Sequence, residues 1–227
     1  MIVVVKKSFK ELYLTKTNFV FLGLGALLLF LFFLFTFWVR ADHLRAFDFD
    51  TTVRLQDITP LRIDSFFSFL SVIGRFEYTT PALAIVLLFW SRLKPRRLLS
   101  VFIIIGLFGT AHVIEVIGKT ILEQPGPPNM FLRSQFSEFP GLHVYTNASY
   151  PSGHSLRIIF LGVIYFYLIL KSKLHIFIKL AVFLFLTGTT CAMLYSRVSL
   201  GEHWITDVIG GTILGLSIAL LSLILLV

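Results

Sequence analysis

Charged residues and cysteine are both scarce in this sequence. Charged side chains make up 14% of the 227 residues, against roughly 25% in an ordinary soluble domain. The chain is 56% hydrophobic and has a mean hydropathy of +0.87, which excludes a typical water-soluble fold. The single cysteine, Cys191, lies in an apolar run, so neither a disulfide framework nor a cysteine metal site is available. We expect Cys191 to be a small, buried, apolar residue.

Processing signals, repeats and long linkers are also missing. The first long apolar run, at residues 18–39, has no small-residue cleavage site. It is also longer than the roughly 7 to 15 apolar residues of a signal peptide. This run is therefore predicted to remain as a membrane anchor. Without repeats or low-complexity tracts, the sequence predicts one integral membrane domain over residues 1–227.

Long apolar runs dominate the rest of the chain. A bilayer core about 30 Å thick needs about 20 apolar residues per spanning helix, because backbone amides cannot be hydrated inside it. The stretch at residues 65–73 is rich in phenylalanine and ends at Gly74, which indicates an interfacial helix and a turn. The expected fold is all-α, a polytopic membrane protein with six transmembrane helices and this interfacial helix before the second. The predicted spans are residues 18–39, 78–92, 98–121, 152–170, 174–195 and 204–226.

Basic residues indicate both the partner and the orientation. There are 20 Lys and Arg against 12 Asp and Glu, a net charge of +8. They flank the apolar runs, so the expected partner is a lipid bilayer and not nucleic acid. Because cytoplasmic connections retain Lys and Arg, both termini are predicted to be cytoplasmic, in a prokaryotic plasma membrane, with the polar loops outside. Three basic clusters share the cytoplasmic side: Lys6, Lys7, Lys10 and Lys16; Arg92, Lys94, Arg96 and Arg97; Lys171, Lys173 and Lys179.

Ionisable side chains at membrane depth are costly and are therefore functional candidates. His112, Glu115 and Lys119 follow one another at spacings of three and four residues, which places them on one stripe of the third span. Glu115 is expected to pair with Lys119 one turn later. The competing interpretation of this group is a structural ion pair beside a satisfied core histidine.

A second candidate lies where the long outer loop enters the fourth span. The segment reads Tyr150-Pro151-Ser152-Gly153-His154-Ser155. Proline suits a first helical turn and glycine lets an anion approach the free amides of that turn. The pattern predicts an anion-binding helix N-terminus with a histidine beside it.

A third candidate joins the fifth and sixth spans. Ser196 and Arg197 end one helix, and His203 and Asp207 open the next. Four residues correspond to a rise of about 6 Å, so Asp207 can accept a hydrogen bond from one nitrogen of His203 and leave the other unprotonated. A nucleophilic imidazole needs this arrangement. Helix capping by Asp207 is the simpler alternative, and Arg197 strengthens the catalytic interpretation.

Together the three segments resemble the type 2 phosphatidic acid phosphatase superfamily, in its membrane branch. The family signature is a lysine followed seven and eight positions later by Arg-Pro, then Pro-Ser-Gly-His, then Ser-Arg with His and Asp at fixed distances. The sequence supplies Pro151 to His154 complete, and Ser196, Arg197, His203 and Asp207 at the family spacing. Lys119 and Pro127 match the first part, but Gly126 replaces its arginine. The Phe49-Asp50 element before the second span also resembles the family.

The resemblance implies a lipid phosphatase that acts on a phosphate monoester or pyrophosphate at the outer leaflet. His203 would attack phosphorus and form a phosphohistidine, Asp207 would support it, and His154 would act as general acid. The phosphate oxygens would be bound by Lys119, Ser152, Gly153 and Arg197. The resemblance implies no cofactor and no metal. A zinc site of His154, His203 and Asp207 is the alternative by ligand type, but Lys119 and Arg197 would repel the ion.

Gly126 is the main departure from the family pattern. Loss of one donor to developing charge costs about 10²-fold or more in rate. Arg157, one helical turn after His154, is a candidate replacement in the phosphate pocket, because a bare arginine there is expensive. Pairing of Arg157 with Glu115 or Glu202 is the structural alternative. Arg133, in the outer loop, is a weaker substitute.

Two other functions remain open from the sequence. One is a lipid phosphotransferase with the same site, which would differ in its acceptor. The other is a catalytically silent lipid-binding or transport protein, which Gly126 favours and the intact His154, His203 and Asp207 oppose. The proline-rich loop 123–150 is expected to cover the site and to set specificity. These motifs specify neither the headgroup nor the oligomeric state.

Overall fold

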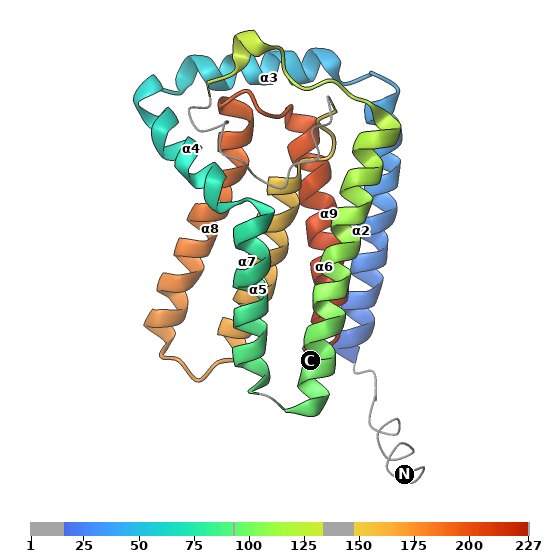
Figure 1. Cartoon of the computed structure of the whole chain (residues 1–227), viewed down its shortest axis with the longest axis vertical. Coiled ribbons are helices and arrows are strands. Elements are labelled where there is room, and N and C mark those ends of the chain that lie inside the picture. Colours follow the sequence, from blue (N-terminus) through green and yellow to red (C-terminus); the bar gives the residue numbers. More distant parts are fainter. Residues whose placement is uncertain (1–15, 93, 134–147, 227) are drawn as a thin grey trace.

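The structure is a bundle of long helices, one end of which is crossed by shorter ones (Figure 1). It is a computed structural model that describes residues 16–92, 94–133 and 148–226, and these ranges contain no β-strand. The long helices are α2 (Lys16–Arg40), α5 (Phe76–Ser91), α6 (Pro95–Leu122), α7 (Gly153–Lys171), α8 (Ile176–Ser199) and α9 (Ile205–Leu223). The shorter ones are α3 (Arg45–Ile58), η1 (Leu61–Ile63), α4 (Asp64–Ile73) and η2 (Asn129–Phe131).

The predicted membrane architecture is confirmed. Five of the helices are long and apolar enough to span a bilayer, namely α2, α6, α7, α8 and α9. There are six passages if residues 61–73 and α5, a pair that bends by 57° at Gly74 and Arg75, count as one broken span. Helix α4 lies in the first part of this pair, where the sequence predicts an interfacial helix at residues 65–73. The fold is therefore all-α and polytopic.

Helix α9 lies at the centre of the bundle, packed against α2 and α7. A Cβ on Gly211 would overlap the backbone oxygen of Ser152, and one on Gly215 would overlap the backbone of Leu156. Glycine at these positions lets α9 approach the first turns of α7. The helix ends that carry the second and third sequence motifs are thereby brought together. Below them the core continues through Phe108, Phe160 and other fully buried side chains.

Helix α8 lies at the edge of the bundle and contacts α7 and α4. Most of its surface faces outward, and Cys191 on it is exposed. The prediction that Cys191 is buried was therefore wrong. An apolar residue in a membrane helix need not face protein, because lipid solvates it equally well.

The two ends of the bundle differ in charge and in the segments that they contain. The start of α2, the end of α9 and the connections around residues 92–95 and 172–175 lie at one end (Figure 1). These connections carry the second and third basic clusters, while Lys6, Lys7 and Lys10 lie outside the described residues. Helix α3 crosses the opposite end of the bundle (Figure 1). The candidate site lies at that opposite end.

Candidate active site

The second and third motifs meet at the ends of three helices. Ser152 is the N-cap of α7, Arg197 lies in the last turn of α8, and Asp207 lies in the first turn of α9. The backbone amide of Ser152 donates to the backbone oxygen of Asp207 at 3.0 Å. That hydrogen bond joins the start of α7 to the start of α9, so the residues of both motifs face one small volume.

His203 and Asp207 have the geometry expected of a supported nucleophile. His203 Nδ1 lies 3.3 Å from Asp207 Oδ2, and the aspartate is fully buried. A carboxylate only accepts hydrogen bonds, so Nδ1 carries the proton and Nε2 of a neutral ring is unprotonated. Asp207 Oδ2 also accepts from the backbone amide of Trp204 at 2.9 Å. The Asp207 carboxylate thus both caps the start of α9 and supports His203, which the sequence analysis had treated as alternatives.

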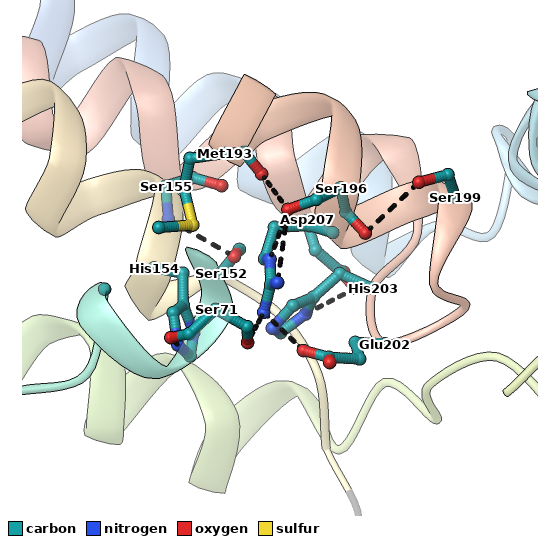
Figure 2. A network of polar contacts seen from close by, with 12 residues as sticks. Ser71, Ser152, His154, Ser155, Met193, Ser196, Ser199, Glu202, His203 and Asp207 are labelled. Carbon is teal, nitrogen blue, oxygen red and sulfur yellow. Dashed lines mark hydrogen bonds and ion pairs between the residues drawn. The ribbon is translucent and has the colours of Figure 1, made fainter. Parts of the chain in front are cut away.

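His154 is held by a residue that no motif contains. Its Nε2 lies 3.1 Å from the backbone oxygen of Ser71 on α4. A carbonyl oxygen only accepts, so this contact places a proton on Nε2. Figure 2 shows Ser71 and His154 on one side of a polar network that also includes Glu202 and His203. His154, with a proton on Nε2, and the candidate nucleophile His203 therefore belong to the same polar network.

Arg197 is at the centre of this network and is fully buried. Its Nη1 donates to Ser71 Oγ at 2.6 Å and forms a short ion pair with Glu202. Its Nε and Nη2 donate to Ser196 Oγ at 3.4 and 3.2 Å. Every nitrogen of the guanidinium thus has a protein partner, and α4 closes over it from the outer side.

Glu115 organises the second group of cations. Lys119 Nζ donates to its Oε1 at 2.8 Å, which confirms the predicted pair. His112 Nδ1 lies 3.0 Å from Oε2 and its ring packs edge-on against Phe76 and Phe108, as the structural interpretation of that histidine requires. The Glu115 carboxylate lies directly beside Gly153, in the space that a side chain there would fill.

Arg157 also reaches Glu115. Its Nη1 lies 3.5 Å from Glu115 Oε2, and its Nε donates to the backbone oxygen of Gly74 at 2.9 Å. These contacts correspond to the ion-pair alternative described for this residue. The Arg133 guanidinium instead binds Asp64 at 2.9 Å and the backbone oxygens of Gln56 and Thr59. It anchors the loop after α6 to α3 and to the start of α4.

Gly126 lies on the outer loop beside Ser149. A Cβ there would be 3.5 Å from the Cβ of Ser149, an ordinary contact. A cavity of about 370 Å³ is lined by Gly126, Trp204, Asp48 and neighbouring residues. The position of the family arginine can therefore accept a side chain. Residues 134–147 of the loop that was predicted to cover the site lie outside the described residues.

Asp48 on α3 caps the helix that carries Asp207. Its carboxylate accepts from the amide of Thr206 at 2.9 Å and from the Thr206 hydroxyl at 2.8 Å. Burial raises the pKa of the Asp48 carboxyl to about 6, against the hydrogen bonds from Thr206, which lower it. The amide of the first turn of α9 thus has a partner from a helix outside the bundle.

Sequence reasoning missed Ser71 and Asp48, and it did not assign Glu202 to Arg197. No periodic pattern marks Ser71 or Asp48, because each acts across a contact between helices distant in sequence. Within the described ranges no group of three or more His, Cys, Asp and Glu has the arrangement of a metal site. The alternative zinc site therefore finds no ligand set there.

Comparison with known proteins identifies the family of the chain. Residues 97–226 match the PAP2 superfamily. The chain belongs to this superfamily. It is 31% identical over 156 residues to the undecaprenyl-diphosphatase of Sulfolobus acidocaldarius, an alignment that covers 68% of this chain and 66% of that protein.

Two solved structures share the fold of this PAP2 protein. One is the transmembrane PAP2 type phosphatidylglycerolphosphate phosphatase from Bacillus subtilis, with a TM-score of 0.65, 22% identity, and coverage of 88% of this chain and 93% of that one. The other is Aquifex aeolicus LpxE, with a TM-score of 0.55, 22% identity, and coverage of 77% and 93%. The chain is thus an integral membrane protein with the fold of membrane PAP2 phosphatases.

Proposed function

We propose that this PAP2 protein is a lipid phosphatase that hydrolyses a phosphate monoester or a diphosphate of a membrane lipid. The observation that carries the proposal is that Asp207 supports His203, that His154 carries a proton on Nε2, and that both histidines lie in one polar network with buried Arg197. Family membership supports the reaction class, and the similarity to an undecaprenyl-diphosphatase supports a lipid diphosphate among the substrates.

In the proposed reaction, His203 Nε2 attacks phosphorus in line while the bond from phosphorus to the leaving oxygen breaks. His154 gives its Nε2 proton to that oxygen, which takes the place of the Ser71 carbonyl as hydrogen-bond partner. The product is a phosphohistidine. His154, now unprotonated at that nitrogen, then takes a proton from water as the water attacks phosphorus, which releases inorganic phosphate and restores both rings.

Charge on the phosphate oxygens is met by fixed protein groups in this proposal. Lys119 and Arg197 supply positive charge, and the Ser152 hydroxyl and the Gly153 amide supply hydrogen bonds at the start of α7. Arg157, like Lys119, forms an ion pair with Glu115 and neutralises its charge. Because positioning and electrostatics supply the stabilisation, we expect chelation with EDTA to leave the rate of phosphate release unchanged.

The test is phosphate release from lipid substrates by purified protein in detergent. The panel contains undecaprenyl pyrophosphate, phosphatidic acid and phosphatidylglycerophosphate, and acid-labile, base-stable phosphate bound to the protein reports the phosphohistidine. His203→Ala should abolish both signals, whereas His43→Ala, which removes an exposed histidine outside the site, should retain both. Absence of release from every substrate by the wild-type protein would favour a silent lipid-binding homologue.

We also propose that the site faces the extracytoplasmic side. The support is the separation of the basic connections from the site at opposite ends of the bundle. A cysteine placed at exposed Met130, in a Cys191→Ser background, should react with a membrane-impermeant thiol reagent in intact cells. A cysteine placed at Lys173 should react only after the cells are opened, and the reverse pattern contradicts the proposed orientation.

A further inference from the structure

The substrate-free structure leaves no open face on Arg197. Its side chain is 0% exposed, and Ser71, Ser196 and Glu202 occupy its nitrogens. Because the guanidinium is fully buried, a phosphate bound at His203 can contact it only after a neighbouring group has moved. Ser196 precedes Arg197 on the same helix, and Ser71 belongs to a helix packed against α8. Glu202 is the remaining candidate.

Glu202 is held more loosely than Glu115, the carboxylate that pairs with Lys119 and Arg157. The Glu115 side chain is 9% exposed and contacts His112, Lys119 and Arg157. The Glu202 side chain is 21% exposed and lies in the turn between α8 and α9, directly before His203. Rotation of the Glu202 side chain therefore uncovers Arg197 without disturbing a helix.

We propose that Glu202 is a resident anion that the substrate's phosphate group must displace from Arg197, and that it thereby sets the affinity of the site for phosphate. This inference rests on the proposed function, in which Arg197 binds the phosphate. Figure 2 shows Glu202 beside His203 in the polar network. The carboxylate and the phosphate group compete for the same N–H donor.

Displacement has a consequence for selectivity. The common headgroups of a membrane are phosphodiesters with one negative charge, equal to the charge of Glu202. Exchange of such a group for Glu202 brings no electrostatic gain, whereas a monoester or a diphosphate carries more charge and does gain. Glu202 thus acts against the abundant wrong ligand, a recognised route to specificity.

The test compares Glu202→Gln with the wild-type protein. Glutamine keeps the shape and one acceptor but removes the charge. Because contacts between charged groups are the stronger ones, loss of the competitor should lower the inhibition constant of inorganic phosphate roughly tenfold. KM for the lipid substrate should fall in the same direction. Phosphatidylglycerol in mixed micelles should inhibit the variant at concentrations that leave the wild-type protein unaffected.

The matched control is Glu123→Gln. Glu123 is an exposed acid at the end of α6, so this variant removes the same charge from the same end of the bundle without altering Arg197. Its phosphate affinity should equal that of the wild-type protein. An equal gain in both variants would attribute the effect to overall charge and would overturn the proposal.

A binding measurement separates this inference from the proposed reaction. Inorganic phosphate raises the unfolding temperature of any variant that binds it, whether or not that variant turns over a lipid. A larger phosphate-induced rise in Glu202→Gln supports the resident anion even if no lipid is hydrolysed. An unchanged inhibition constant and an unchanged thermal shift overturn it, as does a lower kcat with no gain in phosphate affinity, since Glu202 would then hold Arg197 in its working position.

Discussion

Replacement of Gly153 by alanine tests the contact between the first turn of α7 and Glu115. An ideal Cβ on Gly153 would lie 2.5 Å from Glu115 Cδ and 2.6 Å from Oε2, and closer still to Oε1. Ordinary van der Waals contact begins at 3.4 Å, so the carboxylate must move by roughly 1 Å. A flexible glutamate would normally move at little cost. This one is held by Lys119 at 2.8 Å and by His112 at 3.0 Å.

The cost follows from those contacts. Hydrogen bonds that involve charged groups contribute roughly 1.5–3 kcal/mol each, and displacement weakens two of them, so we expect the free energy of unfolding to fall by about 3 kcal/mol. Overpacking of a tight interior has a similar range, roughly 1–3 kcal/mol. Displacement of Glu115 also shifts its partner Lys119, a proposed phosphate ligand, so kcat should fall by about 10²-fold.

The assay is a double-mutant cycle with Glu115→Ala, measured by reversible denaturation in detergent and tryptophan fluorescence. Without the carboxylate, the added methyl group meets open space and should cost less than about 1 kcal/mol. Gly109→Ala is the control, because a Cβ there has nothing within 4 Å. That helical substitution should stabilise the protein by roughly 0.5–1 kcal/mol.

An equal cost of Gly153→Ala in both backgrounds would refute the reasoning. It would mean that the alanine disturbs the α7 backbone itself and that Glu115 does not fill the space beside Gly153. A cost below about 1 kcal/mol in the wild-type background would also contradict it, since it would show that the carboxylate moves freely.

Three further predictions concern other residues. Gly126→Arg should raise kcat/KM by up to about 10²-fold, because the loop has room for the side chain and one added donor contributes about that much. Gly126→Ala is the control. An unchanged kcat/KM would show that position 126 does not reach the phosphate. Arg157→Ala should lower the unfolding free energy by roughly 3–5 kcal/mol, since it breaks a buried pair, with little change in KM; a tenfold rise in KM would instead make Arg157 a phosphate ligand. The pKa of Asp48 is raised from 3.8 to about 6, so the folded protein holds a proton in that window which the unfolded chain releases. Thermal stability should therefore fall as pH rises through it, and Asp48→Asn should remove this dependence; a parallel fall in the variant would assign the titration to another group.

The spanning helices were predictable because each needs a bilayer-length apolar run, and α4 because its aromatic stretch ends at Gly74. Helix α3 was not predicted. Its polar and apolar residues alternate without a periodic apolar face, and the helix is held by tertiary contacts instead. Asp48 binds Thr206, and Gln56 donates to the backbone oxygens of Phe131 and Ser199 at 2.6 and 3.0 Å. Such contacts become visible only when the ends of the bundle are assembled.

The same distinction holds within the site. His203 and Asp207 are one turn apart on the chain, so helical geometry alone predicted their contact. Ser71 reaches Arg197 across 126 positions and depends on the 57° bend between the two halves of the second passage. Sequence spacing indicates neither the direction nor the size of such a bend. The sequence analysis identified Glu202 as a possible ion-pair partner of Arg157. In the structure, Glu202 pairs with Arg197 instead.

Charge pairing connects Gly126 with Glu202. In the substrate-free structure Lys119 and Arg157 share Glu115, and Arg197 is paired with Glu202. A buried cation without a partner is strongly destabilising, so each cation of the proposed clamp is neutralised before any substrate arrives. Phosphate binding is then an exchange of one anion for another. An arginine at position 126 would add a cation beyond those that Glu115 and Glu202 neutralise, in a cavity that Asp48 and Glu123 also line. Gly126→Arg should therefore tighten phosphate binding even in the His203→Ala background, where no chemistry occurs, and equal phosphate affinity with and without that arginine would contradict the exchange.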